Sequence, residues 1–146
     1  MNKAQNLLEA LEDLTWENYV DIADAVTQFD KVEIDTEMTR QASIYSYYQG
    51  LLSVAKRNLD KANLDLTTYT AQTRKEKKST TSAKQTAKDL DDFVESTLDY
   101  AAYSRDVNDA SFKYTLLKGL VSSLEHKKDM LVQLSSNRRA ETNLYR

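Results

Sequence analysis

Apolar and aromatic residues recur every seven positions between Met38 and Tyr69. The repeat forms two rows, one made of Met38, Tyr45, Leu52, Leu59 and Leu66 and the other of Tyr48, Ala55, Ala62 and Tyr69. Rows that lie three and four positions apart fall on one face of an α-helix and form a seam against a partner helix. The spacing therefore predicts a long coiled-coil helix. It would span roughly 48 Å at 1.5 Å per residue, so we expect an elongated protein.

A second long apolar face begins after Asp91 and continues toward the end of the chain. Its strongest part has apolar residues at spacings of three and four, among them Leu117, Leu120, Leu124, Leu131 and Leu134. A polar gap at Lys127 and Lys128 interrupts this face, and residues 104–111 are weak enough for a bend or a break. The matching periods predict that the two long helices form an antiparallel helical hairpin or coiled coil.

Two short acidic helices are expected ahead of the hairpin. The first, at residues 2–14, has leucines at helical spacing, which are Leu7, Leu8, Leu11 and Leu14. Thr15 can cap the second, at about residues 16–29. These helices either pack on the long helices or form a mobile docking element for a basic partner. We therefore divide a single domain into acidic helices at residues 1–35 and the hairpin at residues 36–146.

The composition favours an all-α fold. The chain has 146 residues with no Pro and two Gly, which leaves few residues for β-turns or a multi-stranded sheet. Hydrophobic residues make up 40% of the chain and charged residues 29%, so a seam, or a core shared between chains, suits it better than a spherical core. We therefore expect a homo-oligomer.

Composition also bears on the cellular compartment. The chain has no Cys, which excludes disulfides and thiolate metal sites and fits a reducing compartment. Its start lacks the basic-then-apolar order of a signal peptide, and no apolar run approaches the roughly 18 residues of a membrane span. We expect a cytoplasmic protein that makes no contact with a membrane.

Charge is distributed unevenly along the chain. Residues 1–37 carry ten acidic and two basic side chains, a balance of −8. Residues 38–146 carry 18 basic and 13 acidic side chains, a balance of +5. Such asymmetry suggests a body that binds a polyanion and an acidic segment that competes with it or recruits a partner.

The basic charge is densest in the stretch that follows Tyr69. Residues 70–88 are rich in Ser and Thr and contain one acidic side chain, Glu76. Their six basic side chains are Arg74, Lys75, Lys77, Lys78, Lys84 and Lys88. A segment of this kind between two helices offers charges and hydrogen-bond donors to phosphates. The alternative is a solvated helix end followed by a polar loop.

Two other clusters admit more than one interpretation. Tyr45, Tyr47 and Tyr48 could stack bases, although their position in or beside the seam favours packing. Arg138 and Arg139 lie near the end of the last helix, where cations complement the helix dipole. They could equally touch phosphate or a neighbouring subunit.

Catalysis is not expected. An enzyme needs converging reactive groups, and the chain offers one His, no Cys and no Gly-rich phosphate loop. His126 lies among lysines, which indicates a surface position. A two-metal carboxylate bundle needs Glu-x-x-His on two helices, and a single His cannot supply that. We therefore expect no metal and no cofactor.

Three segments carry a resemblance to a known family. They are IDTEMTRQASIYSYYQGLLSVAKRNLDKANLDL at residues 34–66, KKSTTSAKQTAK at residues 77–88 and LLKGLVSSLEHKKDMLVQLSSNRRAE at residues 116–141. In this order they resemble the UvsY-like recombination mediator family of tailed phages. The Thr80, Thr81 and Ser82 stretch departs from the Thr-Glu step that this family tends to show after its lysine run.

The resemblance implies a non-enzymatic factor in DNA recombination and repair. Such a factor assembles into a ring-like homo-oligomer, binds single-stranded DNA and helps to load a RecA-type recombinase onto strands covered by ssDNA-binding protein. The first DNA contacts would come from the basic segment, with support from Lys56, Arg57 and Lys61 on the central helix. A phage-encoded chain would act in the host cell cytoplasm. The competing interpretation is a structural or assembly-chaperone helical protein that acts through coiled-coil contacts and binds no DNA.

Overall fold

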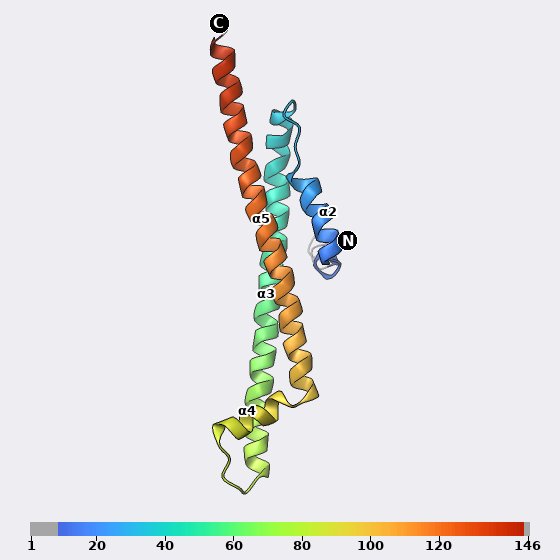
Figure 1. Ribbon diagram of the computed structural model, residues 1–146, viewed down its shortest axis with the longest axis vertical. Coiled ribbons are helices and arrows are strands. Elements are labelled where there is room, and N and C mark those ends of the chain that lie inside the picture. Colours follow the sequence, from blue (N-terminus) through green and yellow to red (C-terminus); the bar gives the residue numbers. More distant parts are fainter. Residues whose placement is uncertain (1–8, 145–146) are drawn as a thin grey trace. The chain divides into compact units, whose positions relative to one another are not determined.

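The computed structural model describes residues 9–144. Its helices are α2 (Trp16–Thr27), α3 (Ile34–Thr80), α4 (Ala87–Glu95) and α5 (Leu98–Leu144), preceded by a helical turn at residues 9–12 (Figure 1). No strand occurs among the described residues, so the all-α prediction is confirmed. The predicted first helix falls partly on residues 2–8, including Leu7 and Leu8, which lie outside the described residues.

The chain forms two compact units. The first combines the chain up to Ala55 with the chain from Lys113 onward, and the second is Lys56–Phe112. Within each unit a part of α3 packs against a part of α5, which confirms the predicted helical hairpin. In the first unit, the end of α2 and the first turn of α3 contact the same residue of α5, Lys127. The expected division at residues 35 and 36 stays a prediction.

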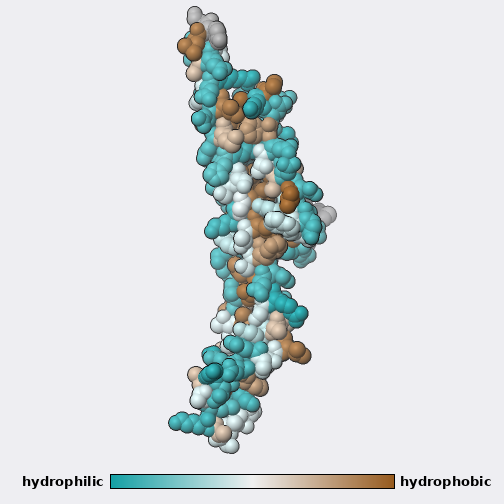
Figure 2. Space-filling view, in the orientation of Figure 1, coloured by the Kyte–Doolittle hydropathy of each residue, from teal (hydrophilic) through white to brown (hydrophobic). Residues whose placement is uncertain are grey.

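The core of the first unit lies between α3 and α5. The leucines expected on the seam of α5 are deeply buried, with exposed fractions of 0% for Leu117, Leu120 and Leu124 and 1% for Leu131. Leu134 is half-buried. Full burial of one such side chain stabilises a fold by about 1.5–3 kcal/mol, so this stripe dominates the stability of the unit. On the face seen in Figure 2, hydrophilic residues predominate and apolar residues form narrow strips between them.

The buried positions of α3 differ from the expected rows. They are Ile34, Gln41, Leu51 and Ala55. Met38 is 37% exposed, and the other members of its row are half-buried, namely Tyr45, Leu52, Leu59 and Leu66. The row that contains Tyr48 and Ala55 faces the core of the first unit. The buried residue beside Ala55 is Leu51, four positions earlier in the helix, rather than Leu52, three positions earlier. Leu51 therefore takes the place that the heptad pattern gave to Leu52, and the Met38 row flanks the interface.

The acidic N-terminal segment packs on this core. Leu11 and Leu14 are buried and join a cluster with α3 and α5 residues that include Ala55 and Leu117. Thr15 caps α2 as predicted, because its side chain accepts from the Asn18 N–H while the Asn18 side chain accepts from the Thr15 N–H. In the first unit, this segment therefore packs on the long helices, which was the first of the two interpretations.

α3 ends later than the hydrophobic pattern suggested, and α5 lacks the bend or break that the pattern allowed. α3 continues beyond Tyr69 to Thr80, and α5 runs without a break through residues 104–111. Hydroxyl side chains in α3 donate to carbonyls one turn earlier, as Thr70 does to Leu66 and Thr80 to Glu76. Lys, Arg, Gln and Glu are also good helix formers, so the polar stretch continues the helix although it lacks an apolar row.

Candidate nucleic-acid interface

The basic segment lies in the second unit, around the junction of α3 and α4. Arg74, Lys75, Lys77 and Lys78 are in the last turns of α3, Lys84 is in the loop of residues 81–86, and Lys88 is in the first turn of α4. The loop that connects α3 and α4 is therefore shorter than the basic segment, and most of the basic side chains lie on helices.

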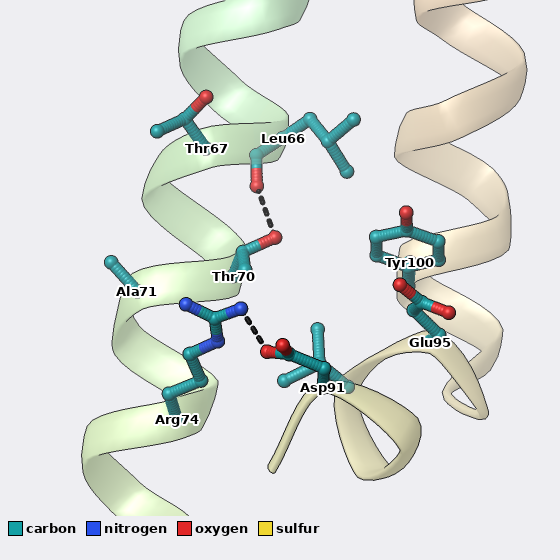
Figure 3. Close-up of a pocket in the computed structure, with 9 residues that line it drawn as sticks. Leu66, Thr67, Thr70, Ala71, Arg74, Asp91, Glu95 and Tyr100 are labelled. Atoms are coloured by element: carbon teal, nitrogen blue, oxygen red, sulfur yellow. Dashed lines mark hydrogen bonds and ion pairs between the residues drawn. The ribbon is translucent and has the colours of Figure 1, made fainter. Parts of the chain in front are cut away.

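Two of the six cations are engaged by α4. Arg74 pairs with Asp91, and Figure 3 shows the guanidinium of α3 facing that carboxylate. The two side chains help to line a pocket of about 390 Å³ that also includes Leu66 and Tyr100. The Lys77 ammonium lies 4.3 Å from the centroid of the Phe93 ring. Both contacts hold α4 against α3, so Arg74 is a structural residue at least as much as a candidate for DNA contact.

Four of the six cations remain exposed without an ionic partner. Within the described part of the chain, no ion pair or side-chain hydrogen bond involves Lys75, Lys78, Lys84 or Lys88. An exposed ammonium without a carboxylate partner can contact a phosphate without first breaking another interaction. These four lysines are the best candidates for backbone contact.

The hydroxyl groups of the segment are less available than expected. Ser79 and Thr80 both donate to the Glu76 carbonyl, at 2.8 and 3.1 Å. The Thr86 hydroxyl donates to Asp89 at 2.8 Å. These groups stabilise helix ends, so the lysines are the stronger candidates for a phosphate contact.

Acidic residues follow the basic segment directly. Five carboxylates occur between residues 89 and 99, at Asp89, Asp91, Asp92, Glu95 and Asp99. The second unit as a whole contains ten basic and ten acidic side chains, which cancel. The expected positive surface is therefore local, and a polyanion would be held by individual lysines at short range rather than by the field of the whole unit.

One of these carboxylates has a clear local role. Asp89 accepts from the Thr86 N–H at 2.9 Å, and the Asp89 N–H donates to the Thr86 hydroxyl at 3.2 Å. This capping box begins α4. The hydrogen bonds from the Thr86 backbone and hydroxyl lower the pKa of Asp89. Asp89 is therefore held in its charged form beside Lys88.

The supporting residues on the central helix are less free than the four lysines. Lys56 pairs with Asp60 at 2.6 Å, and Lys61 lines a pocket together with Asp65 and Asp106. Arg57 is exposed. Of this group, Arg57 is the best placed to add a phosphate contact.

The tyrosine cluster belongs to the first unit and is engaged in packing. Tyr45 donates to Glu125 at 2.8 Å and accepts from Gln49 at 2.7 Å. The rings of Tyr47 and Tyr48 meet edge to face with centroids 5.0 Å apart. Burial, together with the neighbouring Tyr47, raises the pKa of Tyr48. These contacts favour packing over base stacking for the cluster.

Sequence reasoning missed two residues that the structure makes prominent. Lys127 was interpreted as part of a polar gap, yet its side chain is 4% exposed and lies among the core residues. Its spacing gave the signal, because Lys127 follows Leu120 by seven residues and precedes Leu131 by four. Phe93 belongs to the apolar face that was expected to begin after Asp91, yet it is 37% exposed and lies under the Lys77 ammonium.

Among residues 9–144, no three His, Asp or Glu side chains are grouped so that they could hold a metal ion. No helix in this part of the chain is both long enough and apolar enough to span a bilayer. No protein family, curated protein or solved structure matches the chain.

Proposed function

We propose that this chain binds single-stranded DNA through the junction of α3 and α4. The observation that carries the proposal is the set of four exposed lysines without ionic partners, Lys75, Lys78, Lys84 and Lys88. Arg74 and Lys77 position these lysines, because their contacts with Asp91 and Phe93 hold α4 beside the end of α3 in the unbound chain. The junction thus combines an ordered frame with exposed, charged side chains.

Phosphate contacts of this kind are weak individually and strongly dependent on salt. Each one releases a condensed counterion, and the logarithm of the affinity falls by about 0.7 per contact for each tenfold increase in salt on a single strand. The expected homo-oligomer would multiply the contacts through effective concentration. Its existence stays a prediction, and so does the loading of a RecA-type recombinase, which rests on the family resemblance alone.

The test is a salt titration of binding to a labelled single-stranded oligonucleotide, followed by fluorescence anisotropy. Replacing Lys75 and Lys78 by Ala should weaken binding at low salt and reduce the salt slope by about 1.4, because two phosphate contacts are lost. The matched control replaces Lys31 and Lys118, which are exposed lysines of the first unit. It removes the same charge and should leave the slope nearly unchanged.

Equal slopes for the two double variants would locate the DNA contact elsewhere, since total charge alone would then explain the effect. A helicity measurement by circular dichroism accompanies both variants. These lysines make no described tertiary contact, so the helix content should match that of the unmodified chain.

A second candidate function is a helical protein that acts through protein contacts alone. Two observations favour it. The second unit has equal numbers of basic and acidic side chains. On α2, the side chains of Trp16 and Val20 are 56% and 50% exposed. Under this alternative the unmodified chain would not bind any oligonucleotide even at low salt. The same titration therefore decides between the two functions.

A further inference from the structure

The second unit has a hollow beside the basic junction that contains an exposed aromatic ring. It has a volume of about 450 Å³ and is lined by residues of α3, α4 and the start of α5, among them Glu76, Lys77, Phe93 and Asp99. This volume is in the range of small-ligand pockets. Phe93 is 37% exposed, and one side chain, Lys77, lies over its ring.

We infer that this hollow takes a nucleobase that carries an exocyclic amino group and stacks it on Phe93. The inference rests on the proposed function, since the base would belong to the strand whose phosphates meet Lys75 and Lys78. A base stacks on any exposed aromatic face, and this contact is stronger than an exposed contact between an ammonium and a ring. The base therefore replaces the Lys77 ammonium, which moves to an adjoining phosphate, while the ion pair between Arg74 and Asp91 continues to hold α4 against α3.

The carboxylates of the hollow define which base edge is accepted. Glu76 and Asp99 are exposed, and their side chains make no described hydrogen bond or ion pair. Ionised carboxylates only accept hydrogen bonds, so they match the amino group of cytosine or adenine. Thymine offers a single donor, its ring N3–H, whereas the amino group of cytosine offers two hydrogens, one for each carboxylate. A strand of cytosines should therefore bind more tightly than a strand of thymines at the same length and salt.

The hollow also explains how a junction with no net charge can hold a strand. Its carboxylates repel phosphate but bind the base edge, while the lysines on the last turns of α3 and on α4 bind the backbone. Base and backbone are thus recognised by different groups. Binding would favour single strands over duplex, because only an unpaired base can enter.

The experiment compares Phe93→Leu with Phe112→Leu, using labelled oligo(dC) and oligo(dT). Phe112 is the matched control, since it is 47% exposed in the same unit and does not line the hollow. Phe93→Leu should weaken oligo(dC) binding by about 5-fold to 150-fold, which corresponds to the loss of one stacked base. The salt slope should not change, and Phe112→Leu should bind as the unmodified chain does. Phe93→Trp should retain the affinity, because a larger ring replaces the phenyl.

The outcomes separate this inference from the proposed function. If the unmodified chain binds oligonucleotides but Phe93→Leu and Phe112→Leu bind equally well, the stacking site is wrong and the phosphate contact stands. Equal affinity for oligo(dC) and oligo(dT) would overturn the role of the carboxylates. If the unmodified chain binds neither strand, the proposed function itself fails. Circular dichroism of Phe93→Leu and Phe93→Trp checks that the helices are intact.

Discussion

Lys127 shows how a charged residue can belong to a helical core. Its ammonium donates to the carbonyls of Val26 and Gln28, at 3.0 and 2.9 Å, and to the Glu37 carboxylate at 3.1 Å. All three donors of the ammonium are therefore used, which compensates its removal from water. The two carbonyls lie at the end of α2, which has no basic residue in its own last turn. Lys127 thus supplies from α5 the positive charge that a helix end favours.

Replacing Lys127 by Met should destabilise the fold by about 2–4 kcal/mol, because it leaves the Glu37 carboxylate and two carbonyls without their donor. Lys128→Met is the control, since Lys128 is exposed and pairs only with its neighbour Asp129 at 3.2 Å. That variant should change the free energy of unfolding by less than about 0.5 kcal/mol. Urea unfolding followed by circular dichroism measures both. Similar losses for the two variants would show that the buried contacts of Lys127 contribute little.

Lys113 repeats this arrangement one helical turn before the buried leucines. Its ammonium donates to the carbonyls of Leu11 and Glu12, at 2.7 and 2.8 Å, where the helical turn of residues 9–12 ends. Gly119 lies between the two lysines, and a Cβ there would come within 3.4 Å of the Tyr19 hydroxyl. Gly119 of α5 therefore lies directly beneath the Tyr19 side chain of α2.

At the level of elements, helix caps define where α4 and α5 begin. Thr86 caps α4, and the Thr97 hydroxyl accepts from the Tyr100 N–H at 3.2 Å at the start of α5. The Thr97 hydroxyl also donates to the Val94 carbonyl and accepts from the Tyr69 hydroxyl. One side chain thus joins three helices of the second unit, and it accounts for the break between α4 and α5.

The cap of α4 gives a prediction about pH. Hydrogen bonds from Thr86 lower the pKa of Asp89, so the capped form is favoured above the ordinary pKa of an aspartate and is lost as the pH falls through the lowered pKa. Thr86→Ala removes the hydroxyl donor and should raise the pKa of Asp89, while the Thr86 N–H still donates. An NMR titration of the side-chain carboxyl carbons measures this change. Glu17 of α2, whose pKa is lowered by hydrogen bonds from its own backbone N–H and from the Thr15 hydroxyl, should titrate as before.

A pKa of Asp89 that is the same in both proteins would contradict this account of the cap. The titration is informative because Asp89 is exposed, so burial has little part in its lowered pKa and the hydrogen bonds dominate.

The helices were the most predictable level of this structure. Hydrophobic spacing located both long helices and their antiparallel packing, and the residue type at Thr15 located a cap. The ends of α3 and the continuity of α5 through residues 104–111 were not predictable from apolar spacing. Polar residues with good helix propensity and hydroxyls that bond to the preceding turn carry these stretches, and neither leaves a period in the hydrophobic pattern.

At the level of the whole molecule, the buried residues are unequally shared. The first unit holds the fully buried leucines of α5, whereas residues 98–111 of the same helix are half-buried or exposed. In a hydrogen-exchange experiment, amides in residues 116–131 should therefore exchange more slowly than those in residues 98–111. Both segments are helical, so the difference measures packing rather than secondary structure. Equal protection along α5 would mean that the helix opens as one cooperative element.

The candidate interface was only partly predictable from the sequence. The density of lysines identified the segment, because charge is read directly from residue types. Pairing was not predictable, since Arg74 meets Asp91 only through the fold that brings α4 against α3. The same holds for Phe93, which meets Lys77 only because α4 packs against α3. Charge runs therefore indicate where to look, and the fold decides which cations remain free.

Trp16 is the only tryptophan in the chain, it lies on α2, and its ring stacks on Tyr19 with centroids 5.8 Å apart. The intrinsic indole emission of the protein therefore originates entirely in the acidic segment of the first unit. Fluorescence spectra would report whether that segment stays packed on the first unit, and they would not detect unfolding confined to the junction of α3 and α4. A melting curve followed by tryptophan fluorescence and one followed by circular dichroism consequently report on different events in this protein.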